Sequence, residues 1–573
     1  MFQGCGNSLG VAVGYAHIVR NRSISIEKQT VCDAEQEVRR LDEAIGIACT
    51  QMEALLLEAE ASLSSDEADI FEMHLALLED PGYLGKVRER IRTEQANAEW
   101  ALMEETSRLV TSFGEKGDML KQRTADLREI ELRLSDILLD QQPQATKMLQ
   151  ENSILIGDEL LPSQILKLDV TKTKGVATSG GGATSHAAIL AKAQGIPAVF
   201  GAQGLLEQIT DGDYVIVDAD TGTIYINPTN DVLLAYQKKV AEQAQLSEFA
   251  KAYRTAQAAT TDGKRILVEG NIAGPMGTAS VLAAGADGVG LFRTEFLYLE
   301  RDTLPAEEEQ FAFYLKAVRG MQGLPLVIRT LDIGGDKQVC SLGLNQEANP
   351  FLGYRAIRIC LDQEPVFRTQ LRAILRASAF GPISIMFPMI SCVEELRQAK
   401  AILSGVREEL LHEQIPFDTN VPVGIMVETP AAAMLSDLLA REVDFFSIGT
   451  NDLIQYTAAV DRMNGRIAHL ASPYHPGVLR LIANIVSGAA KQSIPVAVCG
   501  EMAGEFPLIP LLIGLGVDAL SMSASLITKA KYIVCNTPFH QAQGLAQRAL
   551  SLSTVQELRE AVSLFHETLI PPA

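Results

Sequence analysis

The sequence predicts a multidomain α/β protein, in which a swivelling α/β domain carries an inserted α-helical bundle and is followed by a (β/α)8 TIM barrel. Three observations predict this architecture. Short apolar runs separated by turns occur in residues 1–30 and 145–229, as expected for strands of one sheet. Residues 31–144 instead repeat apolar residues at three- and four-residue steps. Residues 263–573 contain eight strand-like runs, spaced widely enough for a helix between each pair.

The composition is that of a globular protein without a basic surface. Hydrophobic residues make up 47% and charged residues 21% of the 573 residues, which is ordinary. The formal net charge of −22 at pH 7 excludes generic binding to nucleic acid or anionic membranes, because both need positive charge. The 8 cysteines form no CxxC pair, and no run of about 18 apolar residues occurs. We therefore expect a cytoplasmic protein without membrane insertion, a disulfide framework or structural zinc.

The α/β domain is predicted to combine the first thirty residues with a later segment. Residues 10–19 alternate small and apolar residues, which is typical of a strand. Further strands are predicted at 154–157, 175–178, 198–201 and 214–218. The first thirty residues are too few to fold alone, so we expect them to join this sheet.

The inserted bundle is predicted to contain four amphipathic helices, with stripes that begin at Asp33 and continue through 66–80, 83–113 and 117–140. Between Asp33 and Asp80 the chain has fourteen acidic residues and two arginines. Such a run is usually a solvated face, but it would also steer a basic partner protein to this surface. The second helix has more apolar edge than one stripe needs. We expect it to carry a docking patch for that partner that includes Glu67, Phe71, His74 and Leu78.

A linker helix is predicted in residues 230–262, which are largely polar and end in a turn-forming sequence. The barrel strands are predicted at 264–269, 287–292, 326–331, 383–388, 423–428, 444–449, 495–499 and 519–522. Their span of about 255 residues is typical of a (β/α)8 barrel, whose active site lies at the C-terminal ends of the strands. A doubly wound open sheet is the competing architecture.

A glycine-rich turn before a helix places a histidine where it could act as a nucleophile. Gly180-Gly181-Gly182 lets the backbone pass close to a bulky group, and Thr184-Ser185 is a helix-start signal. His186 then lies in the first turn, where free N–H groups and the helix dipole favour an anion and disfavour imidazolium. A neutral imidazole in such a place suits a phosphoryl acceptor. The alternative is a helix with an incidental histidine.

Charged residues collect at the predicted C-terminal ends of the barrel strands. A single arginine there would normally be an ion-pair partner, but Arg293, Arg329 and Arg462 together call for a carboxylate or phosphate ligand. Glu428 and Asp452 offer two hard oxygen ligands, which suits Mg²⁺ that keeps waters and shares a substrate phosphate. Mn²⁺ can substitute, since it prefers the same ligands. Taken singly, either acid would be structural.

Cys499 is the candidate proton donor. Most free cysteines are small buried hydrophobes. A thiol at the end of the seventh strand, with a pKa near the ordinary value of about 8.5, would be largely protonated at neutral pH. An enolate released from an enol phosphate needs such a donor at carbon.

Seven ordered motifs lie between residues 181 and 504. They are GGxTSH at 181–186, GVGLxRTEFL at 288–297, RTxDIGGDK at 329–337, NPFLGxRAIR at 349–358, MVETPAA at 426–432, FFSIGTNDL at 445–453 and CGExAG at 499–504. With these motifs the chain resembles the enzyme I family of the bacterial sugar phosphotransferase system, the phosphoenolpyruvate–protein phosphotransferases. The resemblance implies a phosphohistidine domain, an inserted subdomain that docks the carrier HPr or an HPr-like protein, and a barrel that binds phosphoenolpyruvate and Mg²⁺ and forms a homodimer.

The resemblance also implies roles for individual residues. His186 would be the phosphorylated nucleophile, and Cys499 would protonate the enolate to give pyruvate. Phosphoenolpyruvate would be held by Arg293, Arg329, Asn451, Asp452 and Arg462, and the metal by Glu428 and Asp452. The reaction would be the first step of sugar uptake.

Three positions depart from the family pattern. Ala183 stands where the family usually has arginine, Met463 replaces the glycine after Arg462, and Ala471-Ser472 replaces a Tyr-polar pair. None of them removes a catalytic residue, and they favour a paralogue that serves a specialised carrier.

Two rival functions remain. Pyruvate phosphate dikinase and phosphoenolpyruvate synthase use a similar histidine domain and barrel, but they need a large ATP-binding domain. Here about 110 helical residues occupy that space, and no GxxxxGK[ST] motif is present. A non-catalytic regulatory binder of phosphoenolpyruvate is the second rival, and the intact set of metal, arginine, cysteine and histidine positions speaks against it.

Overall fold

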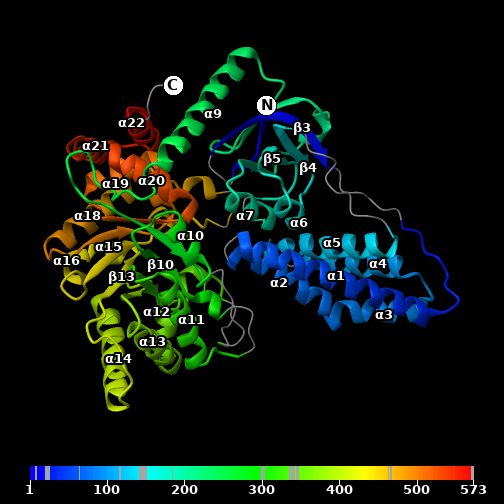
Figure 1. Cartoon of the computed structure of the whole chain (residues 1–573), viewed down its shortest axis with the longest axis horizontal. Coiled ribbons are helices and arrows are strands. Elements are labelled where there is room, and N and C mark those ends of the chain that lie inside the picture. The colour runs from blue at the N-terminus through cyan, green and yellow to red at the C-terminus, as the bar shows by residue number, and fades with distance from the viewer. Residues whose placement is uncertain are drawn as a thin grey trace. The chain divides into compact units, whose positions relative to one another are not determined.

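The computed structural model divides the chain into two compact units, Met1–Gln243 and Ala244–Ala573 (Figure 1). It describes all residues except 7–9, 20–25, 63–64, 115–117, 141–150, 183–184, 299–302, 335–341, 343–346, 463, 465–466 and 570–573. Side chains at 57–58, 60–69, 81, 112–123, 125, 193, 242–244, 246–247 and 469 also lie outside the described part. The division falls inside helix α9 (Asn230–Lys251). The domain boundaries predicted from the sequence stay predictions.

The first unit contains the predicted α/β sheet, with strands in the order β1-β8-β7-β3-β4-β5-β6-β2. These strands are β1 Phe2–Gln3, β2 Cys5–Gly6, β3 Val11–Val19, β4 Ser153–Gly157, β5 Thr173–Thr178, β6 Ala198–Phe200, β7 Tyr214–Asp218 and β8 Thr223–Ile226. The central strands β3, β4, β5 and β6 pair in parallel, while β7, β8, β1 and β2 add antiparallel edges. The first residues therefore do return to the later sheet, as predicted. Three short helices flank it: α6 Pro162–Leu166, α7 His186–Ala193 and α8 Leu205–Gln208.

The bundle has five helices in the described residues, not the predicted four (Figure 1). They are α1 Ala34–Ser62, α2 Ser65–Glu79, α3 Pro81–Glu94, α4 Ala98–Gly114 and α5 Asp118–Leu138. The predicted stripe over 83–113 is broken at Gln95, which takes a left-handed conformation with φ 46°. The break lets the backbone pair with the segment that enters the bundle, since Val31 N–H donates to Gln95 O over 2.8 Å. The periodic pattern could not show this pairing because the partners are distant in sequence.

The second unit is a closed barrel of eight parallel strands. These are β9 Leu267–Ile272, β10 Val289–Arg293, β11 Leu326–Arg329, β12 Ile383–Phe387, β13 Val423–Val427, β14 Phe445–Ile448, β15 Val496–Val498 and β16 Ala519–Met522. All eight predicted runs are confirmed. Closure by β16 against β9 excludes the open sheet. The first strand begins later than predicted because Thr260 and Lys264 close a turn around Gly263, whose φ is 91°.

Helices and short helical turns connect the barrel strands or follow the last of them. They are α10 Gly277–Ala283, η1 Glu295–Leu297, α11 Glu307–Gly320, η3 Pro350–Leu352, α12 Ile357–Asp362, α13 Glu364–Ser378, α14 Val393–His412, α15 Pro430–Met434, α16 Ser436–Leu439, α17 Thr450–Ala458, η4 Ala468–Leu470, α18 Pro476–Ala490, η5 Glu501–Gly504, η6 Phe506–Leu508, α19 Ile509–Leu515, α20 Ala524–Asn536, α21 Phe539–Ser551 and α22 Val555–Glu567. Of the helices that the structure describes, none is at once long and apolar enough to cross a bilayer.

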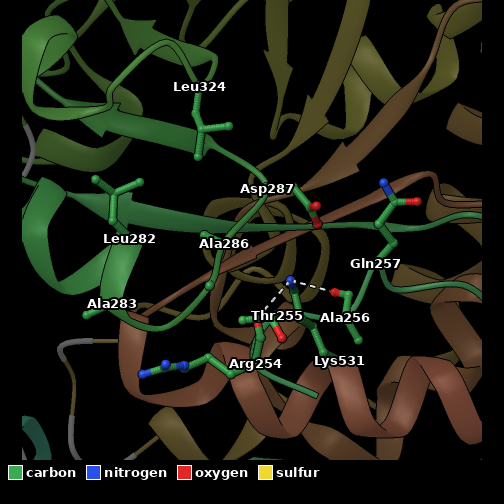
Figure 2. Close-up of a pocket in the computed structure, with 11 residues that line it drawn as sticks. Arg254, Thr255, Ala256, Gln257, Leu282, Ala283, Ala286, Asp287, Leu324 and Lys531 are labelled. Atoms are coloured by element: carbon green, nitrogen blue, oxygen red, sulfur yellow. Dashed lines mark hydrogen bonds between the residues drawn. The ribbon is translucent and has the colours of Figure 1, made fainter. Parts of the chain in front are cut away.

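A cavity of about 440 Å³ lies beside the N-terminal ends of β10 and β11, between Leu324, Ala286 and the segment that follows α9 (Figure 2). Lys531 of α20 lines it, and its Nζ donates to the carbonyls of Arg254 (3.4 Å) and Ala256 (2.9 Å). This lysine is 3% exposed and holds the chain after α9 against the barrel. Active sites of such barrels lie at the opposite, C-terminal ends of the strands.

Candidate active site

His186 begins α7, directly after the glycine-rich turn, as the helix-start signal predicted. Ser185 is the N-cap, and its Oγ accepts from Ala188 N–H over 3.3 Å. Gly181 has a φ of 75°, a conformation that other residues rarely adopt, so a glycine is needed in the turn. Ala183 and Thr184 lie outside the described residues. The local sequence thus fixes the histidine at a helix N-terminus, with its side chain 23% exposed.

A buried carboxylate holds the His186 ring. Asp126 Oδ1, on α5, lies 2.9 Å from His186 Nδ1 and 2.9 Å from His74 Nε2. Burial raises the pKa of Asp126, but the hydrogen bonds from His186 and His74 outweigh it and hold the pKa at about 2. An ionised carboxylate only accepts hydrogen bonds, so His186 Nδ1 carries the proton. Nε2 of His186 has no hydrogen-bond partner in the part of the chain that is described, which leaves its lone pair able to attack an electrophile.

The predicted docking patch on α2 is wrong for three of its four residues. Phe71 and His74 are 0% exposed and Leu78 is 1% exposed. They face inward because α2 packs against α1, α5 and α7, and its wide apolar edge fills a core shared with the sheet. Glu67 lies in α2, but its side chain is outside the described part. The wide apolar edge of α2 therefore reflects its packing against three other helices, and it is not an exposed docking surface.

At the barrel, two predicted arginines lie side by side. Arg293 on β10 is the register partner of Arg329 on β11, so both stand at the C-terminal end of neighbouring strands. Arg329 Nη2 donates to Glu295 Oε1 over 2.7 Å, and Nη1 pairs with Asp332 Oδ2 over 2.8 Å. Burial opposes the charge of Arg329, but Asp332, Glu295 and Glu428 outweigh it and raise its pKa. Arg329 is therefore a fixed positive charge.

Glu428 and Asp452 form the predicted pair of carboxylates. Glu428 follows β13, is 1% exposed, and its Oε1 accepts from Met389 N–H over 2.6 Å. Burial, followed by the charges of Asp452 and Asp332, raises the pKa of Glu428 to about 8. Asp452 Oδ1 is buried without a hydrogen-bond partner in the described residues. Two buried acids that repel each other, one with an oxygen left unpaired, fit a divalent cation.

Cys499 lies where a proton donor is expected. It follows β15, is 3% exposed and packs with Leu291, Met386 and Met426 inside the barrel. Burial is the main cause that raises the pKa of its thiol to about 11. The thiol is therefore protonated at neutral pH, more firmly than its ordinary pKa alone would ensure.

Asn451 and Arg462 lie on or just after α17. Asn451 Oδ1 accepts from Glu501 N–H over 3.0 Å, which ties α17 to η5 beyond β15. The guanidinium of Arg462 lies 6.0 Å from the ring centroid of Phe351, as does that of Arg355. Ser472 is buried, and its Oγ accepts a hydrogen bond from Tyr474 N–H over 3.2 Å. Met463 lies outside the described residues. Asn451 and Arg462 thus both belong to the C-terminal end of the barrel.

Comparison with known proteins decides the family. Three signatures of PEP-utilising enzymes match in order: the N-terminal region over residues 3–123, the mobile domain over 149–222 and the PEP-binding domain over 247–539. The chain belongs to the PEP-utilising enzyme family. Within the family it groups with the phosphoenolpyruvate-protein phosphotransferases. That of Geobacillus stearothermophilus is 44% identical over 558 residues, covering 97% of this chain and 96% of the relative. That of Bacillus subtilis (strain 168) is 43% identical, covering 97% and 98%.

A solution structure titled as Enzyme I is 29% identical and covers 43% of this chain and 100% of its own, with a TM-score of 0.36. That score is too low to support a structural equivalence. The matched regions of the PEP-utilising family contain His186 in the mobile domain and every predicted barrel residue in the PEP-binding domain. Asp126 lies between two matched regions.

Sequence reasoning missed several residues of the site. Glu295, Asp332 and Arg355 are buried and bind the predicted residues directly. All three lie inside the sequence motifs. A buried arginine needs a carboxylate partner, and this requirement alone indicates Asp332, three residues after Arg329. No comparable signal exists for Asp126, which stands sixty residues before His186 on another element.

Proposed function

We propose that the protein transfers the phosphoryl group of phosphoenolpyruvate to His186, and then to a histidine of HPr or an HPr-like carrier, releasing pyruvate as the first step of sugar uptake. The observation that carries the proposal is the buried position of the Cys499 thiol, inside a barrel whose edge holds Arg293 and Arg329. Phosphoryl transfer from an enol phosphate leaves an enolate, and only protonation at carbon makes the step productive. A regulatory binder needs no such acid.

Phosphoenolpyruvate would bind at the C-terminal ends of the barrel strands. Arg293, Arg329 and Arg462 would hold phosphate and carboxylate oxygens, with Asn451 nearby. Glu428 and Asp452 would hold Mg²⁺, for which Mn²⁺ can substitute. When bound, the ion supplies positive charge that polarises the phosphoryl oxygens. Phosphoryl transfer demands mainly positioning and charge stabilisation, so these groups are sufficient.

The proposed transfer forms one bond to phosphorus as another breaks. The His186 Nε2 lone pair forms the N–P bond while the P–O bond to the enol oxygen breaks. The electron pair of that bond returns to oxygen and gives the enolate. Cys499 Sγ–H donates its proton to the enolate carbon, which yields pyruvate and a thiolate that solvent reprotonates. Because His186 and Cys499 belong to different units, the two units must meet during turnover.

The bundle supplies the surface for the carrier. The inward side chains of α2 are core, so docking falls to its exposed acidic residues, among them Glu72 and Glu79. We propose a phosphohistidine domain from residues 1–30 and 145–229, the carrier-binding insert at 31–144, a linker at 230–262 and a dimerising barrel at 263–573. We place the enzyme in the cytoplasm, where its substrates are found.

Labelling with ³²P tests the proposal. Wild-type protein should acquire acid-labile label from phosphoenolpyruvate and pass it to an added HPr-like protein, whereas His186→Ala should acquire none. Persistent label in that variant would refute the assignment. Label acquired from ATP would instead favour the dikinase and synthase alternative.

A further inference from the structure

Asp126 is shared by two histidines, and the second of them has no role in the chemistry proposed above. His74 Nε2 and His186 Nδ1 both lie 2.9 Å from Asp126 Oδ1. The three residues come from three elements, α2, α5 and α7, which meet in the core of the first unit. His74 and Asp126 are both 0% exposed. His74 therefore contacts the same buried carboxylate as His186.

The two imidazoles are what orients the carboxylate. Asp126 Oδ2 and His74 Nδ1 are buried without hydrogen-bond partners among the described residues. The orientation of the carboxylate is therefore fixed through Oδ1, by one N–H from each ring. Without the His74 N–H, the buried charge would keep a single donor, so the carboxyl group would take up a proton more readily. A protonated carboxyl can donate to His186 Nδ1, which moves the ring proton to Nε2.

We propose that His74 is a positioning residue for phosphoryl transfer. By donating Nε2–H to Asp126 Oδ1, it holds the carboxylate so that the proton of His186 stays on Nδ1 and the lone pair stays on Nε2. The opposite tautomer would place a proton on the attacking nitrogen and block the N–P bond. This inference rests on the proposed role of His186 as acceptor. The competing reading is that His74 only fills the core, where its ring meets Phe71 edge to face with centroids 6.1 Å apart.

Substitutions at His74 separate the two readings in the full-length protein. His74→Gln keeps an N–H near the position of Nε2, whereas His74→Phe keeps a ring but removes the donor. Leu78→Ala is the matched control, because Leu78 is buried on the same helix and packs in the same core. The tautomer of His186 is read from ¹⁵N chemical shifts of ¹⁵N-histidine-labelled protein. The rate of phosphorylation by phosphoenolpyruvate is read in a single turnover.

The Nδ1–H tautomer should dominate in wild type, His74→Gln and Leu78→Ala, and become mixed in His74→Phe. Phosphorylation should slow about 10- to 100-fold in His74→Phe, the range seen when an outer-shell partner is removed from a metal-bound histidine, and recover in His74→Gln. A wild-type tautomer and rate in His74→Phe would overturn the proposal. Equal losses in His74→Gln and His74→Phe would assign His74 to the core and also overturn it.

Asp126→Asn tests the hydrogen bonds that link His74, Asp126 and His186, and it leaves the His74 side chain unchanged. Its amide N–H₂ can donate to His186 Nδ1, which moves the ring proton to Nε2, and phosphorylation should fall by a factor on the order of 10³ to 10⁴. An unchanged tautomer would contradict the proposal. Failure of the proposed function would show itself differently, as label on a residue other than His186, and the ¹⁵N shifts would still decide the part played by His74.

Discussion

The guanidinium of Arg355 donates to the carboxylate of Asp452, with Nη2 and Oδ2 3.3 Å apart. The same Nη2 lies 3.0 Å from Asp332 Oδ1. Burial opposes the charge of Arg355, but Asp332 and Asp452 outweigh it and raise its pKa. The acid proposed to hold the metal is thus partly neutralised in advance, which lowers the cost of keeping two carboxylates together in the barrel.

Replacing Arg355 with methionine should therefore damage both stability and metal-dependent turnover. Asp332 and Asp452 would each lose a buried partner, and breaking a buried pair typically costs about 3–5 kcal/mol. Denaturant unfolding and pyruvate release as a function of Mg²⁺ concentration measure the two effects. Arg358→Met is the control, since Arg358 donates to the carbonyls of Leu352 and Gly353. Equal losses in both variants would count against the role of Arg355 at the metal site.

Cys499→Ser should slow pyruvate formation by about 10²- to 10⁴-fold, the usual contribution of a general acid. The hydroxyl is a far weaker acid than the thiol, while the change in volume is small. The control is Cys360→Ser, because Cys360 is also buried but lies on α12. Stopped-flow detection of pyruvate with purified variants is the measurement. A Cys499→Ser variant that works near the wild-type rate would remove the acid role.

Glu428→Gln should change stability and metal binding in opposite directions. The pKa of Glu428 is about 8 because burial and the neighbouring acids disfavour its charge. At neutral pH the uncharged glutamine should therefore stabilise the metal-free protein relative to wild type. The same change removes a proposed metal ligand. We expect a higher melting temperature without divalent ions, and a Mg²⁺ requirement for phosphorylation raised about tenfold or more. A melting temperature that falls would contradict the electrostatic account, and an unchanged Mg²⁺ requirement would remove Glu428 from the metal site.

Glu269 on β9 should make the barrel less stable as pH rises. Burial, with a smaller effect of Asp287, raises the pKa of Glu269 from 4.5 to about 7. The folded state then binds this proton more tightly than the unfolded state. The free energy of unfolding should therefore fall between about pH 4.5 and 7, by about 3 kcal/mol, and then level off.

Glu269→Gln should remove this slope. The variant should gain stability over wild type at about pH 8 and lose the advantage near pH 4.5, as measured by denaturant unfolding followed by a barrel-specific probe. Glu408→Gln, at an exposed position of α14, serves as control. The same slope in wild type and Glu269→Gln would show that another group titrates.

The eight barrel strands were predictable because most of them are buried apolar runs at helix-length spacing, and the candidate site at their C-terminal ends follows from the chemistry of the residues there. The break between α3 and α4 was not, because it depends on pairing of Gln95 with the distant Val31. The same limit explains the α2 error. Periodicity shows how wide an apolar face is, but it does not show that α1, α5 and α7 all cover it.

At His186, too, the local sequence predicted the helix start but not the contacts with residues far away in the sequence. The glycine turn and the Ser185 cap are encoded locally, so the helix start was predictable. The contact with Asp126 depends on how the bundle meets the sheet, and no sequence spacing records it. This contact moves His74 from the predicted surface patch into the buried core, where it bonds the same carboxylate as His186.

The position of the transferred phosphoryl group tests the central claim most directly. Full-length protein is treated with phosphoenolpyruvate and divalent ion, the product is mapped by mass spectrometry, and ³¹P–¹⁵N couplings identify the nitrogen that carries phosphorus. We predict one phosphoryl group per chain, on Nε2 of His186, with one pyruvate released for each. Phosphate on another residue, or on Nδ1 of His186, would contradict the account.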